Sequence, residues 1–391
     1  MSNTDAGINM RVKVSISEVV GNKQLFKTKI HSVLSMLFLN FMLITLPVKA
    51  EPFVQRIGDP MAHPWGMDFL DDRNLLVTER GGNLFVVNFL TGDRVLVTNL
   101  PKVRARKQGG MLDVAVRHDK LTNKKIIYLC YTQPQKNKSA TAIDMAYFNE
   151  GSLLDRTTIF TSNQPINSNI HFGCRLALDK KYLYATLGDR GKRYQAQDPR
   201  SHNGSIIRLY HDGGIPPVNP NKPGWTPETL SIGHRNPQGI AIHPKTGLVW
   251  THEHGPRGGD EINIIHPGEN FGWPKVSHGR EYHGPSIGVG TSAPGLKDPI
   301  WFWTPSIAPS GMAFYSGKMF KELDGHLLIG SLKFRRLYLL TLEKGMPVHE
   351  TVILDRVIGR VRDVAVAPDG AILLLSDEAQ GGLYRLAKKQ N

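Results

Sequence analysis

The chain has 391 residues, of which 40% are hydrophobic and 21% are charged. This composition is that of a globular protein and excludes a disordered or fibrous chain. The formal net charge of +14 favours anionic partners or simply serves solubility. The basic residues are scattered and show neither helix-turn-helix nor zinc-finger spacing, so no nucleic-acid partner is expected.

Residues 1–50 are predicted to be a secretory signal segment. Three lysines within residues 23–29 precede an apolar run over residues 33–46, which is too short to span a bilayer comfortably. Small residues in the stretch 48–50 then provide a cleavage site of the A-x-A type. An uncleaved membrane anchor is the alternative. No later run is long enough to span, so we expect a periplasmic or secreted protein with no stable membrane insertion after cleavage.

Residues 51–391 are predicted to form one all-β domain. Little helical periodicity is present, and short alternating or β-branched runs lie between Gly, Pro, Asn and Asp turns. One unit recurs: an apolar strand, a polar turn, a second apolar strand and a polar stretch. The first strands of its six copies are residues 66–70, 112–116, 175–179, 239–243, 311–315 and 363–367.

The spacing of these copies predicts a six-bladed β-propeller. From start to start they lie 46, 63, 64, 72 and 52 residues apart. Propeller blades run about 40–50 residues, with insertions in loops, and six such units close into a ring with short, protected strand edges. The alternative, a β-sandwich with extra hairpins, does not explain six copies. We expect the long third, fourth and fifth spacings to add loops near the central axis, where a site would form.

The densest polar stretches flank the strand pair of the fourth copy. Arg235 and Asn236 offer a planar set of donors that suits a flat, multiply charged ligand, although a structural arginine would also fit. His252 and His254 alternate along a strand, so a transition-metal pair is conceivable. The carbonyl groups of the turn at residues 255–256 would instead suit Ca²⁺.

A histidine and several basic residues lie at other strand ends. His171 precedes the third copy and Asp189 follows its hairpin, which fits a general base with an orienting carboxylate, although a lone histidine is more often structural. Lys333 follows a strand of the fifth copy, and Arg360 and Arg362 lead into the sixth. Each could equally be a surface charge. With the arginine of the fourth copy they predict a cationic ring around the axis, and therefore an anionic ligand.

Seven motifs then occur in a fixed order. They are Gln108–Asp113, His171–Gly173, Gly233–Gly239, Glu253–Glu261, Asn270–Pro274, Pro305–Gly311 and Arg360–Asp363. Together they closely resemble the soluble PQQ-dependent glucose/sorbosone dehydrogenase family, and most closely its aldose sugar dehydrogenase branch. The resemblance covers residues 52–388 and implies a six-bladed propeller that binds pyrroloquinoline quinone (PQQ) on its axis.

The resemblance also implies roles for individual residues. His171 corresponds to the catalytic base and Asp189 to its helper. The implied PQQ contacts are Gln108, Arg235, Asn236, Tyr282, Ser331, Leu332, Lys333, Arg360, Val361 and Arg362. The implied ligands of two Ca²⁺ ions are the carbonyl groups of Gly255 and Pro256, beside PQQ, and Glu261 with the carbonyl group of Phe271 at a second, structural site. Taken without the resemblance, Glu261 could equally be a solvated side chain.

The implied activity is oxidation of an aldose at C1 to the lactone. Hydride would pass to PQQ while His171 takes the hydroxyl proton. Neither the preferred sugar nor the electron acceptor can be read from the sequence. Two other functions stay open. One is a Ca²⁺-dependent lactonase, which would need an acidic metal cage on the axis, and the other is a non-catalytic carbohydrate-binding propeller.

The two cysteines leave a question open. Cys130 and Cys174 are too few for a disulfide framework, and they either pair or lie separately as small buried residues. Cys174 also stands where the resembled family commonly has glycine. Because it follows the proposed base by three residues, its larger side chain is expected to narrow the pocket.

Overall fold

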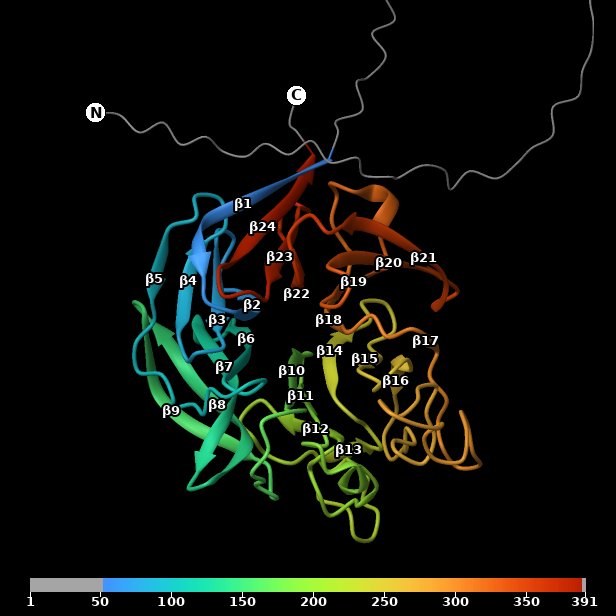
Figure 1. Cartoon of the computed structure of the whole chain (residues 1–391). Helices are drawn as coiled ribbons and strands as arrows, with labels where there is room; N and C mark the ends of the chain where they lie inside the picture. The colour runs from blue at the N-terminus through green and yellow to red at the C-terminus, as the bar shows by residue number, and fades with distance from the viewer. Residues whose placement is uncertain (1–51, 389–391) are drawn as a thin grey trace, which may run out of the picture.

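The computed structural model describes residues 52–388, which form six four-stranded antiparallel sheets arranged around a central axis (Figure 1). The first three sheets contain β2 (Pro64–Phe69), β3 (Asn74–Glu79), β4 (Leu84–Asn88) and β5 (Arg94–Leu96); β6 (Met111–Asp119), β7 (Lys124–Gln135), β8 (Lys138–Asn149) and β9 (Ser152–Thr161); and β10 (Gly173–Leu178), β11 (Tyr182–Leu187), β12 (Ser205–Tyr210) and β13 (Thr229–Ile232). The last three contain β14 (Pro237–Ile242), β15 (Val249–Glu253), β16 (Asp260–Ile265) and β17 (Trp301–Trp303); β18 (Pro309–Phe314), β19 (Leu327–Ser331), β20 (Arg336–Glu343) and β21 (Met346–Asp355); and β22 (Val361–Val366), β23 (Ile372–Ser376), β24 (Gly381–Lys388) and β1 (Pro52–Met61). Two short 3-10 helices, η1 (Arg193–Gln197) and η2 (Lys321–Leu323), lie in loops.

This arrangement confirms the predicted six-bladed propeller, with each of the six predicted first strands innermost in its blade. The ring is closed by a strand that the repeat analysis did not identify. β1 pairs antiparallel with β24, so the sixth blade combines the first and last described strands. The predicted signal at residues 1–50 lies outside the described residues. Within residues 52–388 no helix is long and apolar enough to cross a membrane.

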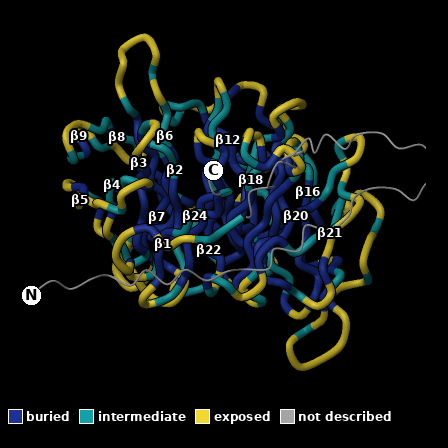
Figure 2. Tube along the Cα trace, turned by 90° about the horizontal axis from the view of Figure 1, so that it is seen from above, coloured by how far each residue is buried: buried dark blue, intermediate teal, exposed yellow. Residues whose placement is uncertain are grey.

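The second strand of each blade is buried along most of its length, since neighbouring blades cover both of its faces. Ile372–Ser376 and Leu327–Ser331 are buried at every residue. Such strands are continuous apolar runs rather than alternating ones, which is why the sequence marked them clearly. Figure 2 shows this buried interior between exposed loops.

The extra residues of the long blades are only partly in loops. The second blade lengthens its strands instead, with 12 residues each in β7 and β8 and 10 in β9. The third and fourth blades do carry long loops, over residues 188–204, 211–228 and 266–300. We call the end of the ring at which the innermost strands begin the entrance face.

Aspartates on the innermost strands join adjacent blades. A carboxylate oxygen of Asp113 on β6 accepts the N–H of Leu176 on β10 at 2.8 Å. Asp363 on β22 accepts the N–H of Met67 on β2 at 2.9 Å, which connects the last blade to the first. Each bond satisfies a donor that faces the axis and has no strand partner on that side. The blades are therefore held together by polar bonds as well as by apolar packing.

A buried arginine closes the axis. Nη1 of Arg175 lies 3.2 Å from Asp113 and 2.9 Å from Asp363, and the guanidinium carbon is 4.2 Å from the ring centroid of Trp65. Arg175 and both aspartates are the third residues of their strands, counted from the entrance face. Behind this cluster a cavity of about 320 Å³ is lined by the later residues of the innermost strands. The cluster therefore separates the entrance from that cavity.

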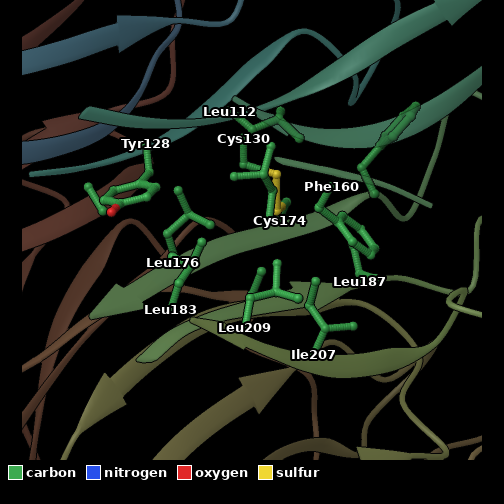
Figure 3. Packing of buried hydrophobic residues seen from close by; sticks show 14 of the residues in the cluster. Leu112, Tyr128, Cys130, Phe160, Cys174, Leu176, Leu183, Leu187, Ile207 and Leu209 are labelled. Atoms are coloured by element: carbon green, nitrogen blue, oxygen red, sulfur yellow. A yellow bond between two sulfur atoms is a disulfide. The ribbon is translucent and has the colours of Figure 1, made fainter. Parts of the chain in front are cut away.

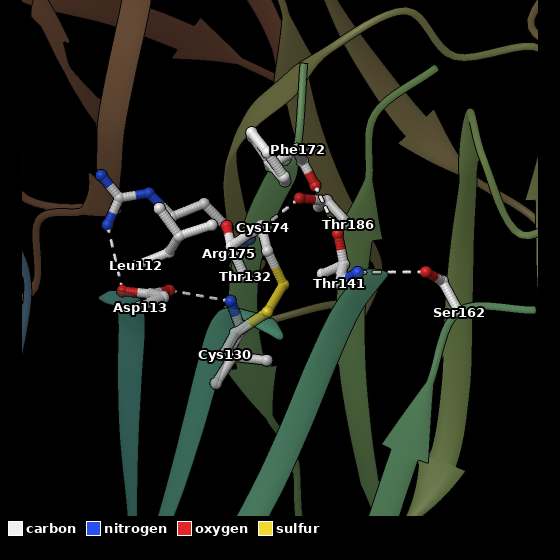
Figure 4. The surroundings of a disulfide bond; sticks show 12 residues. Leu112, Asp113, Cys130, Thr132, Thr141, Ser162, Phe172, Cys174, Arg175 and Thr186 are labelled. Atoms are coloured by element: carbon white, nitrogen blue, oxygen red, sulfur yellow. Dashed lines mark hydrogen bonds and ion pairs between the residues drawn. A yellow bond between two sulfur atoms is a disulfide. The ribbon is translucent and has the colours of Figure 1, made fainter. Parts of the chain in front are cut away.

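Cys130 and Cys174 form a disulfide between β7 and β10. Figure 3 shows it within the apolar cluster between the second and third blades, near Leu112, Phe160 and Leu187. Cys174 is completely buried, and its side chain points toward Cys130 between the blades (Figure 4). The expectation that Cys174 narrows the pocket is wrong, because its sulfur lies in the core.

Removing this disulfide is expected to destabilise the protein without changing its fold. A double Cys130→Ala/Cys174→Ala variant should lose roughly 2–4 kcal/mol of unfolding free energy, because the closed loop of 44 residues no longer limits the unfolded chain. Urea unfolding followed by tryptophan fluorescence measures this loss. Wild-type protein unfolded with and without reductant is the control, and equal midpoints there would contradict the prediction.

Candidate active site

The predicted site residues come from five blades at the entrance face, with Gln108 before β6. His171 lies before β10, Arg235 before β14, Lys333 after β19 and Arg360 before β22. Each lies where a loop enters or leaves a strand, as the sequence predicted. We call the opening of the central axis at this face the mouth; Arg175 lies two residues further along the axis, at the third position of β10.

His171 and Asp189 form a hydrogen-bonded pair. Nδ1 of His171 lies 2.7 Å from Oδ1 of Asp189, with the histidine side chain 13% exposed and the carboxylate 1% exposed. Because an ionised carboxylate only accepts hydrogen bonds, Nδ1 carries the proton and Nε2 presents a lone pair. Nε2 has no hydrogen-bond partner among the residues described. The pair thus has the arrangement of a general base and its orienting carboxylate.

The backbone of His171 is fixed from two sides. Its N–H donates to Oε1 of Gln108 at 2.7 Å, and its carbonyl group accepts the N–H of Arg190 at 3.1 Å. Its φ of 53° lies in the left-handed region. Gly188 approaches so closely that an added Cβ would lie 2.2 Å from the His171 carbonyl oxygen. Gln108, expected as a cofactor contact, therefore also holds the backbone of His171.

Asp189 is held as an anion by several donors. Besides His171, it accepts the N–H of Gly191 at 2.7 Å and the indole N–H of Trp273 at 2.8 Å. Burial alone would raise the pKa of Asp189. The hydrogen bonds from His171 and Gly191 and the charge of Arg235 outweigh burial, so its pKa lies below the usual value.

Trp273 is a site residue that the sequence analysis did not single out. Two guanidinium groups lie near its indole. The guanidinium carbons of Arg193 and Arg235 are 5.3 and 5.2 Å from the centroid of the indole ring. Arg193 forms a two-point ion pair with Glu281 on the outer side. The tryptophan occurs within the motif at residues 270–274, which was the available signal, but its bond to Asp189 spans 84 residues.

Arg235 is buried beside this network. Its Nη1 donates to the carbonyl groups of His254 at 2.8 Å and Gly255 at 3.3 Å. Its Nε is buried without a hydrogen-bond partner in the described part of the chain, and such a donor is costly unless a ligand satisfies it. Asn236 faces the strands instead, where its Oδ1 accepts the N–H of Gly173 at 3.3 Å.

The predicted contacts of the fifth and sixth blades fall into two groups. Lys333 and Arg360 are exposed, and Nη1 of Arg360 donates to the carbonyl group of Leu332 at 3.3 Å. Ser331, Leu332 and Val361 are buried. The Ser331 hydroxyl donates to the carbonyl group of Ile307, in the loop before β18, at 2.6 Å. The buried residues therefore fix the backbone that carries the two cations.

The last two predicted contacts differ from each other in exposure: Arg362 is buried and Tyr282 is exposed. Nη2 of Arg362 lies 2.5 Å from Oδ2 of Asp377, and its Nη1 donates to Gln238 at 3.1 Å. Because Arg360 and Arg362 are two residues apart, an extended strand would direct both guanidinium groups to one face. The structure exposes Arg360 and pairs Arg362 with a buried carboxylate. Tyr282 is 58% exposed on the outer rim.

Two cross-strand glutamates, Glu253 and Glu261, line a cavity of about 10 Å³. Gly255 and Phe271 line the same cavity, whereas Pro256 does not. Burial, and then the adjacent charge of Glu253, raise the pKa of Glu261 well above its usual value. A cation there would relieve this repulsion.

The side chains of His252 and His254 have different surroundings and do not form a joint metal site. Nε2 of His254 lies 2.6 Å from the carbonyl oxygen of Pro309. His252 is completely buried against Gly239. Residues 52–388 contain no group of three or more His, Cys, Asp or Glu side chains arranged for a metal ion. The conceivable transition-metal pair therefore has no further side-chain ligand here.

Comparison with known proteins agrees with this geometry. The pattern of the family described as glucose/sorbosone dehydrogenase matches residues 61–385. The chain belongs to the glucose/sorbosone dehydrogenase family. The aldose sugar dehydrogenase YliI of Escherichia coli is 35% identical over 86% of this chain and 93% of its own length. The quinoprotein glucose dehydrogenase B of Acinetobacter calcoaceticus is 26% identical over 86% of this chain and 88% of its own length.

Solved structures of this family share the fold. The apo-form of the soluble aldose sugar dehydrogenase from Escherichia coli superimposes with a TM-score of 0.83 at 34% identity, covering 87% of this chain and all of that one. The PQQ-bound aldose sugar dehydrogenase from Streptomyces coelicolor gives a TM-score of 0.72 at 26% identity, covering 87% of this chain and 99% of that one. The glucose/sorbosone dehydrogenase fold thus covers almost every described residue.

Trp273 is expected to act as a positioning residue for the pair. Trp273→Phe removes only the N–H donated to Asp189, and a bond to a charged group contributes about 1.5–3 kcal/mol. We expect kcat for sugar oxidation to fall roughly 10-fold. The pKa of Asp189 rises without this donor and makes the carboxylate a stronger acceptor for His171, so the acid limb of the pH–rate profile moves to higher pH.

The matched control is Trp301→Phe, which removes an indole N–H that has no acceptor among the described residues. Its pH–rate profile should stay at the wild-type position. A Trp273→Phe profile that also stays there, with unchanged kcat, would show that the bond does not position the base.

Proposed function

We propose that this protein oxidises aldose sugars at C1 to the lactone with PQQ and Ca²⁺, and that His171 is the general base. The observation that carries the proposal is the His171–Asp189 pair, whose Nε2 is left free at a mouth that basic side chains surround. When bound, PQQ supplies the quinone that takes the hydride, and Ca²⁺ beside it supplies Lewis-acid polarisation.

The residues present suit a flat tricarboxylate. Lys333 and Arg360 expose their charges at the mouth, and Arg235 keeps a buried Nε that has no acceptor within residues 52–388. Carboxylate groups satisfy such donors with charge-assisted hydrogen bonds. The PQQ-bound relative from Streptomyces coelicolor and the quinoprotein from Acinetobacter calcoaceticus support the same cofactor. Arg362 would contribute less charge, because Asp377 already pairs with it.

The residues also suit Ca²⁺, which prefers hard oxygen ligands. Glu261 is buried beside Glu253 in a cavity of single-ion size, and Phe271 lines that cavity. The carbonyl group of Gly255 would serve the ion beside PQQ, although Arg235 already donates to it at 3.3 Å. Pro256 would contribute its carbonyl group from the same turn.

His171 would hold and move the proton. Its Nε2 would accept the proton of the sugar C1 hydroxyl, and the resulting imidazolium would be stabilised by the anionic Asp189 at Nδ1. Trp273 and the N–H of Gly191 keep that carboxylate in place. The cluster around Arg175 would limit water entry from the far end of the axis.

Reconstitution tests this function. Purified protein should reduce an artificial acceptor with an aldose only when PQQ and Ca²⁺ are added. His171→Asn should lower kcat by about 10²–10⁴-fold, the usual contribution of a general base, while PQQ still binds in an absorbance titration. Lactone hydrolysis without PQQ would instead favour a lactonase, and sugar binding without PQQ binding would favour a carbohydrate-binding propeller.

The glutamate cavity gives a separate test by metal binding. Glu261→Gln removes the negative charge, and Ca²⁺ affinity measured by calorimetry should fall at least 10- to 100-fold, the range seen when even the residues that support metal ligands are replaced. Glu269→Gln is a control, because Glu269 already pairs with Lys297 at 2.8 Å. Equal affinity in the two variants would rule out this cavity as the calcium site.

We also propose that the protein acts in the periplasm or outside the cell after cleavage within the signal predicted at residues 1–50. The disulfide between Cys130 and Cys174 supports this location, since such bonds persist in oxidising compartments. Amino-terminal sequencing of protein recovered from its host tests the cleavage.

A further inference from the structure

We propose that the entrance face is the docking surface for an acidic electron-transfer protein, which takes the electrons released by sugar oxidation. This inference rests on the proposed function. Converting an aldose to a lactone releases two electrons and two protons. Two one-electron carriers would each remove one electron in turn, and the protons pass to solvent.

The loops around the mouth expose basic side chains with little compensation. They are residues 104–108, 190–193, 254–259, 279–283, 332–335 and 356–360. Nine lysines and arginines in them are exposed, among them Arg106, Lys107, Arg257, Arg280, Arg335 and Arg356. Glu281, the one acidic residue in these loops, is half-buried and paired with Arg193. The loop at residues 377–380 on the same face adds Asp377, which is buried and paired with Arg362 and Arg80, and Glu378, which is half-buried beside the backbone N–H of Arg360. The face therefore carries a strong positive field.

The opposite face lacks this bias. Its six hairpins between the first and second strands span residues 70–73, 120–123, 179–181, 243–248, 315–326 and 367–371. They contain six acidic and seven basic residues in all. Net positive charge alone would spread over both faces, so the concentration of basic side chains at the entrance is a local feature.

The acceptor must approach through the same mouth as the sugar. Arg175 closes the axis behind the site through its ion pairs with Asp113 and Asp363. Three predicted cofactor contacts, Gln108, Lys333 and Arg360, are themselves exposed at the entrance. A carrier seated on the rim would therefore face the reduced cofactor directly.

The spacing of the charges favours a macromolecule over a small anion. Arg106 and Lys107 precede the second blade, and Arg257 lies in the fourth blade. Arg335 lies between β19 and β20 of the fifth blade, and Arg356 follows that blade. They are exposed and point into solvent rather than converging on one buried pocket. Broad charge of one sign steers a large partner of opposite sign and raises its association rate by 10–10³-fold at low salt.

The test compares charge reversal on the two faces. An entrance variant, Arg106→Glu/Arg335→Glu/Arg356→Glu, is matched with an opposite-face variant, Lys180→Glu/Lys245→Glu/Lys318→Glu, which changes net charge equally. Each PQQ-loaded protein is reduced with glucose and mixed with an acidic c-type cytochrome, with basic cytochrome c or with neutral benzoquinone. The readout is the cytochrome rate divided by the benzoquinone rate, so that unequal cofactor loading cancels.

At low salt we expect this ratio for the acidic cytochrome to fall roughly 10- to 100-fold in the entrance variant and to stay within about 2-fold in the opposite-face variant. The difference should shrink as salt screens it. Equal losses in both variants, or a faster wild-type rate with the basic cytochrome, would overturn the docking surface. Failure of wild-type protein to reduce benzoquinone would instead overturn the proposed function itself.

Discussion

The ion cluster of Arg175 with Asp113 and Asp363 is the constraint on which the centre of the molecule depends. The innermost strands of the six blades converge on the axis. The side chains at the third residue of each strand must therefore fit into one small space. Three of these positions are glycines, and Cβ atoms added at Gly66 and Gly311 would lie 2.3 and 2.2 Å from the two carboxylates. Burial raises the pKa of both aspartates and the arginine opposes this rise, so each charge is tolerated only because its partners remain. Breaking such a buried pair typically costs 3–5 kcal/mol.

The same cluster links the fold to the chemistry. Nη2 of Arg175 donates to the carbonyl group of Arg362 at 2.8 Å, and its Nε donates to that of Gln238 at 3.0 Å. Gln238 in turn binds the carbonyl group of Gly173, two residues after His171. The loop that carries His171 is thus anchored to the axis. A change at the centre would move the entrance as well as weaken the ring.

The sequence allowed us to predict those features that depend on the repeated pattern and on short motifs. The innermost strands were found because the same apolar pattern recurs six times. The closing strand Pro52–Met61 was not, because only Ile57 and Met61 on it are buried. Two cysteines 44 residues apart could not be paired from spacing alone. The role of Trp273 depends on a hydrogen bond to Asp189 that only the closed ring brings together.

Basic side chains show the limit of sequence reasoning most clearly, because the same residue type serves opposite purposes. Arg190 is 1% exposed, donates to backbone carbonyl groups and lies 3.8 Å from the centroid of Phe172. Burial, with the nearby charge of Arg104, lowers its pKa to about 10. Its charge therefore organises the core and contributes little to the field outside. Arg335 and Arg356, also counted in the +14, expose theirs at the entrance. Net charge cannot separate these roles, but burial can, and only the exposed group is free to attract an anion.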